Sequence, residues 1–148
     1  MINIRTVERG DHPWVASLLR EQWGSTRFVT RGRLWDAEEL PGLIAVRDGN
    51  RVGLATYHLQ GDECELTTFN SLVERVGVGS ALLQSVRDIA VSAGCKRLWL
   101  ITTNDNTAAL RFYQKQGFVL VAVYPNAMEQ YRRLKPEIPL VGNDGIPI

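Results

Sequence analysis

The sequence contains few of the residues that bind metal ions or form disulfides. Its 148 residues include only two cysteines, Cys64 and Cys95, and two histidines, and no CxxC pair occurs. Structural zinc sites combine four such ligands at characteristic spacings. We therefore expect no metal site, and we expect both cysteines to be reduced, as in cytoplasmic proteins.

An excess of one charge is missing as well. Lys and Arg total 17 against 16 Asp and Glu, which gives a formal net charge of +1. Binding to nucleic acids or anionic membranes depends on a strong basic field. The chain also lacks a signal-peptide pattern and has no apolar run near the roughly 20 residues that span a bilayer. We expect neither a nucleic-acid partner nor a membrane partner.

Hydrophobic residues, by contrast, make up 45% of the chain. A chain of this length buries roughly 70% of its extended-state surface, and this composition is sufficient to fill one core. The regular patterns end near Tyr124, so we expect one domain over residues 1–124. Prolines and glycines interrupt residues 125–148, which predicts an extended tail. The apolar residues of this tail suggest that it contributes to a homodimer.

The spacing of hydrophobic residues predicts an α/β (α+β) fold. A meander of three antiparallel strands is followed by helix, strand, helix and strand, and this order predicts a mixed central sheet with a parallel pair at its centre. Residues 25–40 fit either a short helix or a lid-like loop. We expect helices at 12–23, 79–93 and 105–116, and strands at 1–6, 43–46, 52–59, 64–69, 98–101 and 118–124.

A glycine-rich segment joins the third meander strand to the long helix. Gly77 and Gly79 allow the backbone to form a concave nest of N–H groups, and the helix start adds partial positive charge there. Such a nest suits a phosphate or diphosphate. The alternative is that the two glycines only permit a tight turn. The chain has neither a Walker loop nor a complete GxGxxG dinucleotide fingerprint.

A second polar cluster precedes the helix predicted at 105–116. The Asn and Asp residues at 104–106 are good N-caps, and Ala109, Phe112 and Tyr113 are spaced as in an amphipathic helix packed on a core. Tyr113 needs a polar partner if its hydroxyl is buried, and it could deliver a proton if it faces a cleft.

Taken in order, these two segments resemble the GNAT superfamily of acyl-coenzyme A dependent N-acetyltransferases. That family has a [Q/R]xxGx[G/A] loop before the long helix and a later NxxAxxxYxxxGF helix. The residues that match are Gly77 and Gly79 in the loop, and Asn106, Ala109, Tyr113, Gly117 and Phe118 in the helix. The resemblance covers about residues 1–124 and implies a sheet that splays beside the strand preceding the loop.

The resemblance also implies which residues contact acetyl-coenzyme A (acetyl-CoA). Glu74 stands where the family usually has Gln or Arg, which implies weaker cofactor binding than is usual for the family. The implied contacts are Phe69, Asn70 and Ser71 for the pantetheine arm, the loop residues Arg75, Val76, Gly77, Val78, Gly79 and Ser80 for the diphosphate, and Asn106, Ala109 and Phe112 from the later helix.

The same resemblance suggests catalytic roles. Glu65 is the first candidate for the base that deprotonates the amine, Glu63 is its competitor on the same strand face, and both could instead be solvated charges. Tyr113 is the candidate acid for the departing sulfur, with simple hydrogen bonding as its alternative. His58 fits a surface side chain better than a base. Cys64 fits a buried strand residue better than a covalent nucleophile, which favours direct transfer in a ternary complex.

The function implied is transfer of an acetyl group to a primary amine of a small molecule or peptide. A non-catalytic module that binds or senses acyl-CoA is the alternative, and a purely structural domain is a third. Arg27, Arg31 and Arg33 could attract an acceptor that carries a carboxylate or phosphate, or they could form a solvated arm.

Overall fold

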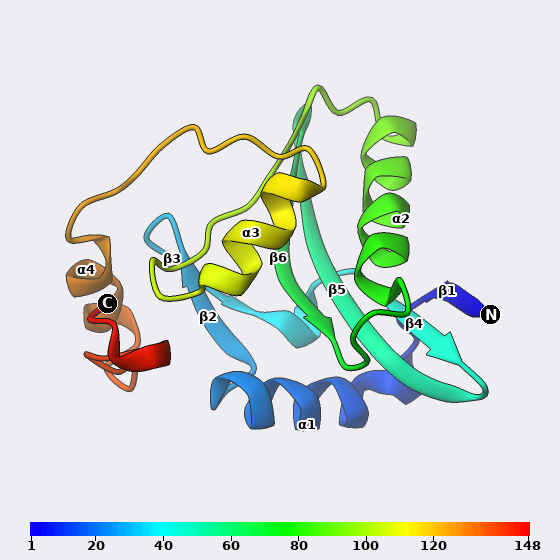
Figure 1. Ribbon diagram of the computed structural model, residues 1–148, viewed down its shortest axis with the longest axis horizontal. Coiled ribbons are helices and arrows are strands. Elements are labelled where there is room, and N and C mark those ends of the chain that lie inside the picture. The colour runs from blue at the N-terminus through cyan, green and yellow to red at the C-terminus, as the bar shows by residue number, and fades with distance from the viewer. The chain divides into compact units, whose positions relative to one another are not determined.

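The central element of the fold is a five-stranded mixed sheet with the strand order β1-β4-β5-β6-β7 (Figure 1). The computed structural model describes residues 1–148. Only the pair β6–β7 is parallel, which confirms the predicted α/β fold with a mixed sheet and an antiparallel meander. The parallel pair lies at the edge of the sheet and not at its centre as predicted, because β7 is the last strand. The strands are β1 (Ile2–Thr6), β4 (Gly42–Arg47), β5 (Asn50–Gln60), β6 (Glu63–Ser71) and β7 (Arg97–Trp99).

The chain divides into two compact units. One comprises residues 1–27 and 36–100, and the other comprises residues 28–35 and 101–148. The first unit holds the whole five-stranded sheet and two helices, α1 (His12–Trp23) and α2 (Val78–Ser92). None of the helices in either unit combines the length and apolarity needed to cross a bilayer.

A tight turn joins β4 to β5, as the sequence predicts. Asp48 and Gly49 both have positive φ, 52° and 78°, and Arg47 pairs with Asn50 across the turn. Two consecutive left-handed residues give a turn whose twist matches that of the flanking strands. The meander that carries the candidate base is therefore fixed by local sequence.

Helix α2 packs against β4, β5 and β6 through one apolar face. Gly53 on β5 makes this close contact possible, because a Cβ there would lie 2.7 Å from Leu82 Cδ1 and 2.8 Å from Val78 Cγ1. The first turn of α2 is thus seated directly on the sheet, and its start is held in place. The buried residues of α2 are Val78, Leu82, Leu83, Val86 and Ala90.

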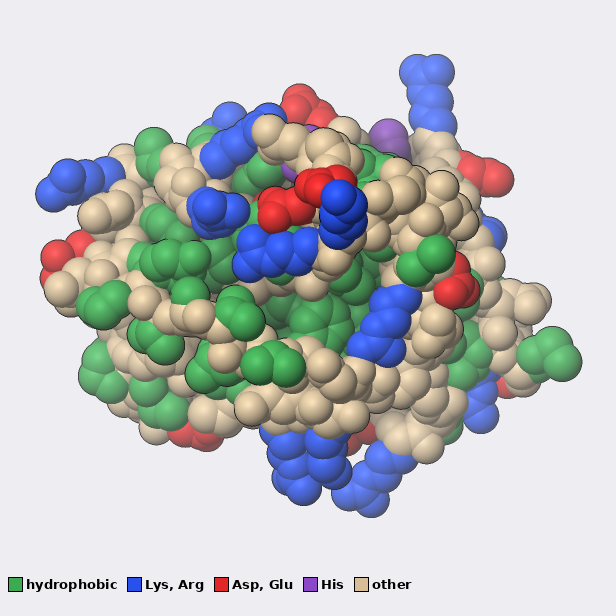
Figure 2. Space-filling model, turned by 90° about the horizontal axis from the view of Figure 1, so that it is seen from above, with side chains coloured by type: hydrophobic (Ala, Val, Ile, Leu, Met, Phe, Trp, Pro, Cys, Tyr) green, Lys and Arg blue, Asp and Glu red, His purple; other side chains and the backbone are tan.

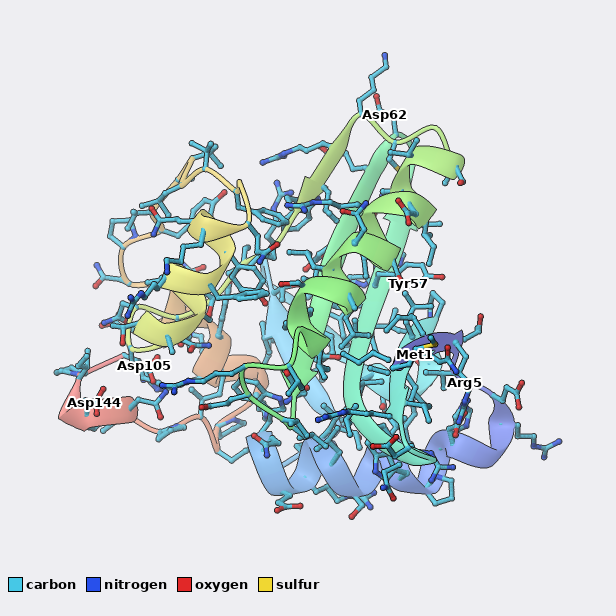
Figure 3. All side chains as sticks on the ribbon, turned by 45° about the vertical axis from the view of Figure 1, so that its right-hand side comes forward. Met1, Arg5, Tyr57, Asp62, Asp105 and Asp144 are labelled. Atoms are coloured by element: carbon cyan, nitrogen blue, oxygen red, sulfur yellow. The ribbon has the colours of Figure 1, made fainter.

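An ionic cluster ties β1 and β5 to the start of α1. The Asp11 carboxylate, only 3% exposed, accepts hydrogen bonds from Arg5 Nη1 at 2.7 Å, from Arg5 Nη2 at 2.8 Å and from Arg51 Nε at 3.0 Å. Arg5 is labelled in Figure 3. Hydrogen bonding by Arg5 holds the pKa of Asp11 well below its usual range. The Asp11 side chain makes no cap hydrogen bond to α1.

The region for which the sequence allowed a short helix or a lid-like loop forms a hairpin instead. It consists of β2 (Arg27–Thr30) and β3 (Arg33–Asp36), followed by one 3-10 turn at Ala37–Glu39. The turn residues Arg31 and Gly32 have φ of 48° and 75°, so they form the same kind of left-handed pair as at β4–β5. The turn was not predicted, because Arg31 stands where Asp or Asn usually precedes the glycine of such a turn.

The second unit contains helices α3 (Thr107–Lys115) and α4 (Ala127–Leu134) and a 3-10 turn at Asn143–Gly145. Helix α3 confirms the helix predicted over 105–116. Helix α4 corrects the prediction that residues 125–148 are extended throughout. Its Tyr131 hydroxyl accepts a hydrogen bond from the Arg31 amide at 2.9 Å, so α4 packs on the β2–β3 turn.

Residues 118–124 do not form the predicted strand. No backbone amide between Val119 and Val123 donates a hydrogen bond, and the Val119 and Val121 side chains are 77% and 74% exposed. The apolar and β-branched residues of this segment indicate strand propensity, but a strand also requires a partner with a matching edge. No partner strand pairs with this segment.

Candidate functional site

The sheet opens along the carboxyl-terminal half of β6. Pairing between β6 and β7 extends only from Glu63↔Arg97 to Glu65↔Trp99, whereas β5 accompanies β6 as far as Ser71. No strand therefore pairs with the β7-facing edge of β6 after Glu65. An unpaired edge can accept an extended ligand as if it were another strand. The contacts predicted for Phe69, Asn70 and Ser71 lie in this stretch and stay a prediction.

A β-bulge interrupts β6 between the candidate base and the open edge. Thr56 of β5 pairs with Thr68, and the next residue, Tyr57, pairs with Leu66, so Thr67 is extra. The Thr56 hydroxyl lies 2.7 Å from the Thr67 hydroxyl and 2.6 Å from that of Thr68. Bulges bend a strand and redirect its side chains, often beside functional sites. The bulge was not predicted, because two adjacent threonines are only a weak indication of a bulge.

The segment between β6 and α2 carries backbone N–H groups that have no acceptor within the chain. Arg75 and Gly77 have φ of 62° and 82°, and the amides of Val76, Gly77, Val78 and Gly79 donate no hydrogen bond within the chain. The first α2 hydrogen bond of this region runs from Ala81 N to Gly77 O at 3.0 Å. Unsatisfied amides at a helix start attract anions. This arrangement agrees with the nest expected from the glycines.

The side chains of this loop are polar and solvent-exposed. Glu74 and Arg75 are both exposed, and neither takes part in an ion pair. Arg75 can therefore turn toward an anion, whereas Glu74 places a negative charge near the same amides. Figure 2 shows the opposite end of the sheet, seen from above Figure 1, where Lys and Arg side chains are interspersed with Asp and Glu.

The two candidate bases on β6 differ in burial. Glu65 is 5% exposed, whereas the Glu63 side chain is 39% exposed and lies 3.2 Å from Arg97 Nη1. His58 of β5 is directly opposite Glu65 in the antiparallel register and is half-buried. Side chains at such paired positions are neighbours on one face of a sheet. The preference for His58 as a surface side chain over a base stays a prediction.

Cys64, next to Glu65, is completely buried. Burial, with smaller contributions from Cys95 and Glu65, raises the pKa of the Cys64 thiol to about 11. Nucleophilic cysteines act as thiolates and have lowered pKa values. Both cysteines are free thiols, and Cys64 is a buried strand residue as expected.

Tyr113 lies on α3 between two other aromatic rings. Its ring centroid is 5.4 Å from that of Phe112 and 5.7 Å from that of Phe118, in edge-to-face geometry. Burial raises the pKa of the Tyr113 phenol above its usual value. The hydroxyl is therefore protonated at neutral pH.

Asn106 is the N-cap of α3, as its place in the sequence suggested. Its side-chain oxygen accepts a hydrogen bond from Ala109 N at 3.4 Å, and its Nδ2 donates to Thr102 Oγ1 at 3.2 Å. One N–H of its amide group remains available for another acceptor. The roles predicted for Asn106, Ala109 and Phe112 in cofactor binding stay predictions.

Asn70 of β6 has a buried polar atom without a partner. It is 6% exposed, and its side-chain oxygen accepts no hydrogen bond, which is costly unless a ligand supplies a donor.

On β3 the Arg33 guanidinium stacks 3.8 Å from the centroid of the Trp35 ring. The structure contains no group of three or more His, Cys, Asp and Glu side chains arranged to hold a metal ion.

Comparison with known proteins decides the family. The sequence profile of the acetyltransferase (GNAT) family matches residues 6–118. The chain belongs to this family. Two uncharacterized proteins of Bacillus subtilis (strain 168) are similar to this GNAT protein along most of its length. YdhI is 42% identical over 149 residues, which cover 100% of this chain and 92% of YdhI. YxbD is 40% identical over 135 residues, which cover 90% of this chain and 85% of YxbD.

Solved structures share the GNAT fold. The aminoglycoside N-acetyltransferase AAC(6')-Iy in complex with CoA has a TM-score of 0.65 and 18% identity, over 86% of this chain and 95% of its own. The ribosomal-protein-S18-alanine N-acetyltransferase from Escherichia coli has a TM-score of 0.63 and 22% identity, over 86% of each chain. At these identities the likeness shows the fold. Membership of the GNAT family supports acyl transfer from an acyl-CoA.

Proposed function

We propose that this GNAT protein transfers an acetyl group from acetyl-CoA to a primary amine of a small molecule or peptide. The observation that carries the proposal is the set of unused N–H groups from Val76 to Gly79 at the start of α2. They are the anion-binding part that a diphosphate requires. The open edge of β6 supplies the second part, a backbone surface for an amide-containing arm.

The residues of the chain fit this ligand in detail. The loop amides and the Arg75 guanidinium would hold the diphosphate, and Asn70 would receive a donor for its buried side-chain oxygen. Phe69 and Ser71 would pair with the arm through their backbone, and Ser80, Ala109 and Phe112 complete the proposed contacts. When bound, acetyl-CoA supplies an acetyl group activated as a thioester.

Two side chains are assigned to proton transfer. Glu65 takes the proton that the amine must lose before its nitrogen can attack a carbonyl carbon. The amine nitrogen then bonds to the acetyl carbon as the carbon–sulfur bond breaks, and Tyr113 gives its phenolic proton to the sulfur. The burial of Glu65 and the ion pair of Glu63 with Arg97 support Glu65 as the base. The protonated state of Tyr113 supports its role as the acid.

Direct transfer in a ternary complex is proposed over a covalent acetyl-enzyme. A cysteine nucleophile beside the base would have to be Cys64, and its raised pKa leaves almost no thiolate at neutral pH. The acceptor amine therefore attacks without an intermediate on the chain. One protein of similar fold is named as an aminoglycoside N-acetyltransferase, and another as a ribosomal-protein-S18-alanine N-acetyltransferase. The acceptors in these names are a small molecule and a protein, so both classes stay in the proposal.

Non-catalytic binding of acyl-CoA is the second candidate function. Its support is the departure of Glu74 from the Gln or Arg that the family usually has at this position. The two functions differ in turnover, which release of free thiol from acetyl-CoA in the presence of a panel of amines measures directly.

For an enzyme we expect thiol release with at least one amine. Glu65→Gln and Tyr113→Phe should each lower kcat on the order of 100-fold, the usual scale of general acid or base catalysis. Glu63→Gln is the matched control and should leave kcat nearly unchanged. CoA binding by calorimetry without turnover on any amine would favour the sensing module, and the absence of binding would exclude both functions.

A further inference from the structure

The start of α3 is fastened by a buried carboxylate. Asp105 is 6% exposed, its Oδ1 accepts a hydrogen bond from Thr103 Oγ1, and its Oδ2 accepts one from Asn143 N at 2.8 Å. The carboxylate takes part in none of the ion pairs. Burying a carboxylate without a cation beside it costs free energy of folding. We therefore expect Asp105 to have a role beyond packing.

The tail passes over Asp105 so closely that only glycine fits. A Cβ on Gly142 would lie 2.6 Å from the Asp105 Cγ and 3.1 Å from its Cβ. A second tie runs from Asn104 Nδ2 to Pro147 O at 2.8 Å. Figure 3 labels Asp105 at the start of α3 and Asp144 on the tail segment beside it.

The tail segment itself is closed into a small loop. Val141 forms an isolated antiparallel bridge with Pro147, and Gly142 N donates to Ile146 O at 2.8 Å. The backbone amide that reaches Asp105 is therefore presented by a closed turn. The tail acts as a fixed partner for the turn before α3.

Asp105 is adjacent to the residue of α3 proposed to contact the cofactor. Asn106 N donates to Thr103 O at 3.1 Å, and Asn106 Nδ2 donates to Thr102 Oγ1 at 3.2 Å. Thr103 thus bonds both to the Asp105 side chain and to the Asn106 backbone. A displacement of Asp105 would therefore act on the turn that holds the Asn106 backbone.

We propose that Asp105 is a positioning residue: held by the tail amide of Asn143, it orients Asn106 toward the cofactor. This inference rests on the proposed use of acetyl-CoA. It makes the tail segment 141–147 a support for the turn that carries Asn106, and Gly142 is needed because any side chain there would displace Asp105.

A double-mutant cycle tests the inference through the KM for acetyl-CoA. Asp105→Ala should raise this KM about tenfold in the wild-type background and less than about twofold in the Asn106→Ala background, since the effect passes through Asn106. The KM for the amine should change little. Loss of thermal stability from Asp105→Ala should be equal in both backgrounds, which separates positioning from a general structural role.

Two tail variants give an independent measurement. In Gly142→Ala the Asp105 carboxylate is still present, but the new Cβ displaces it. This variant should therefore raise the KM for acetyl-CoA as Asp105→Ala does. Asn143→Ala is the matched control, because the hydrogen-bond donor is its backbone amide, and it should leave the KM unchanged. If Asp105→Ala does not fold, Gly142→Ala takes its place in the cycle.

A folded Asp105→Ala or Gly142→Ala protein with unchanged KM for acetyl-CoA would overturn the role of Asp105. An equal rise in KM with and without Asn106 would overturn it too. In both cases the wild-type protein still binds CoA, so the proposed function stands. Wild-type protein that neither binds CoA by calorimetry nor releases thiol would refute the proposed function instead.

Discussion

The two ends of α2 offer a controlled test of the anion-binding loop. Gly77, before the helix, has φ of 82°, and Gly94, after it, has φ of 77°, and a Cβ at either position would meet no atom within 4 Å. Replacement by alanine therefore causes no clash at either glycine. Each substitution costs only the strain of a left-handed L-residue, about 1–2 kcal/mol.

The effect on stability should be the same for Gly77→Ala and Gly94→Ala. A loss of about 1 kcal/mol in the free energy of unfolding corresponds to a fall in Tm of about 4 °C for a chain of this size. Thermal unfolding followed by circular dichroism measures it. Equal Tm values in the two variants would show that the strain is matched.

The effect on cofactor use should differ. The loop amides converge only if Gly77 keeps its positive φ, so a loop distorted by Gly77→Ala should raise the KM for acetyl-CoA about tenfold, the scale of one lost hydrogen bond to a charged group. Gly94→Ala should leave this KM unchanged. Steady-state thiol release gives both constants. Equal KM values for the two variants would refute the assignment of the loop amides to the diphosphate.

Two further predictions concern buried titratable groups. Asp11→Asn should lower the free energy of unfolding by about 3 kcal/mol, because Arg5 and Arg51 lose their shared carboxylate. Since folding lowers the pKa of Asp11, this stabilisation is complete above the unfolded carboxyl pKa of about 3.9 and is lost as the pH falls toward the lower folded value, so the Tm difference from wild type should shrink below about pH 4. A difference that stays constant down to pH 2 would contradict this. The pKa of about 11 and complete burial of Cys64 predict that iodoacetamide at pH 8 alkylates Cys95 first, and peptide mass spectrometry showing equal labelling of the two would argue against the buried thiol.

Local patterns predicted the meander and the helices that follow it. The Asp48–Gly49 turn favours one backbone geometry, and the apolar stripe of α2 matches one face of a helix, so both could be identified without tertiary information. The loop before α2 was predictable for the same reason, since glycines permit the positive φ found at Gly77. The site residues assigned to these elements stay predictions.

Features that depend on distant partners were not predictable. The β2–β3 hairpin turns at Arg31, a residue with no turn preference of its own, and Tyr131 of α4 bonds to its backbone from far along the chain. Strand propensity at residues 118–124 did not produce a strand, because no edge pairs with them. The contact of Asp105 with the tail has no sequence signal, because Asn143 contributes only its backbone amide. The domain boundary at 124 and the homodimer stay predictions.

The strand order of the sheet has a consequence for how the protein folds. Strands β4, β5 and β6 pair with their neighbours in sequence through short turns, whereas Ile4 of β1 must find Ala45 of β4, and Arg97 of β7 must find Glu63 of β6. Closing a longer loop costs more chain entropy before any contact repays it. The meander is thus the natural nucleus, and the two outer strands assemble onto it late. Because the unpaired edge of β6 belongs to that nucleus, the strand proposed to bind the cofactor forms before the sheet around it is complete.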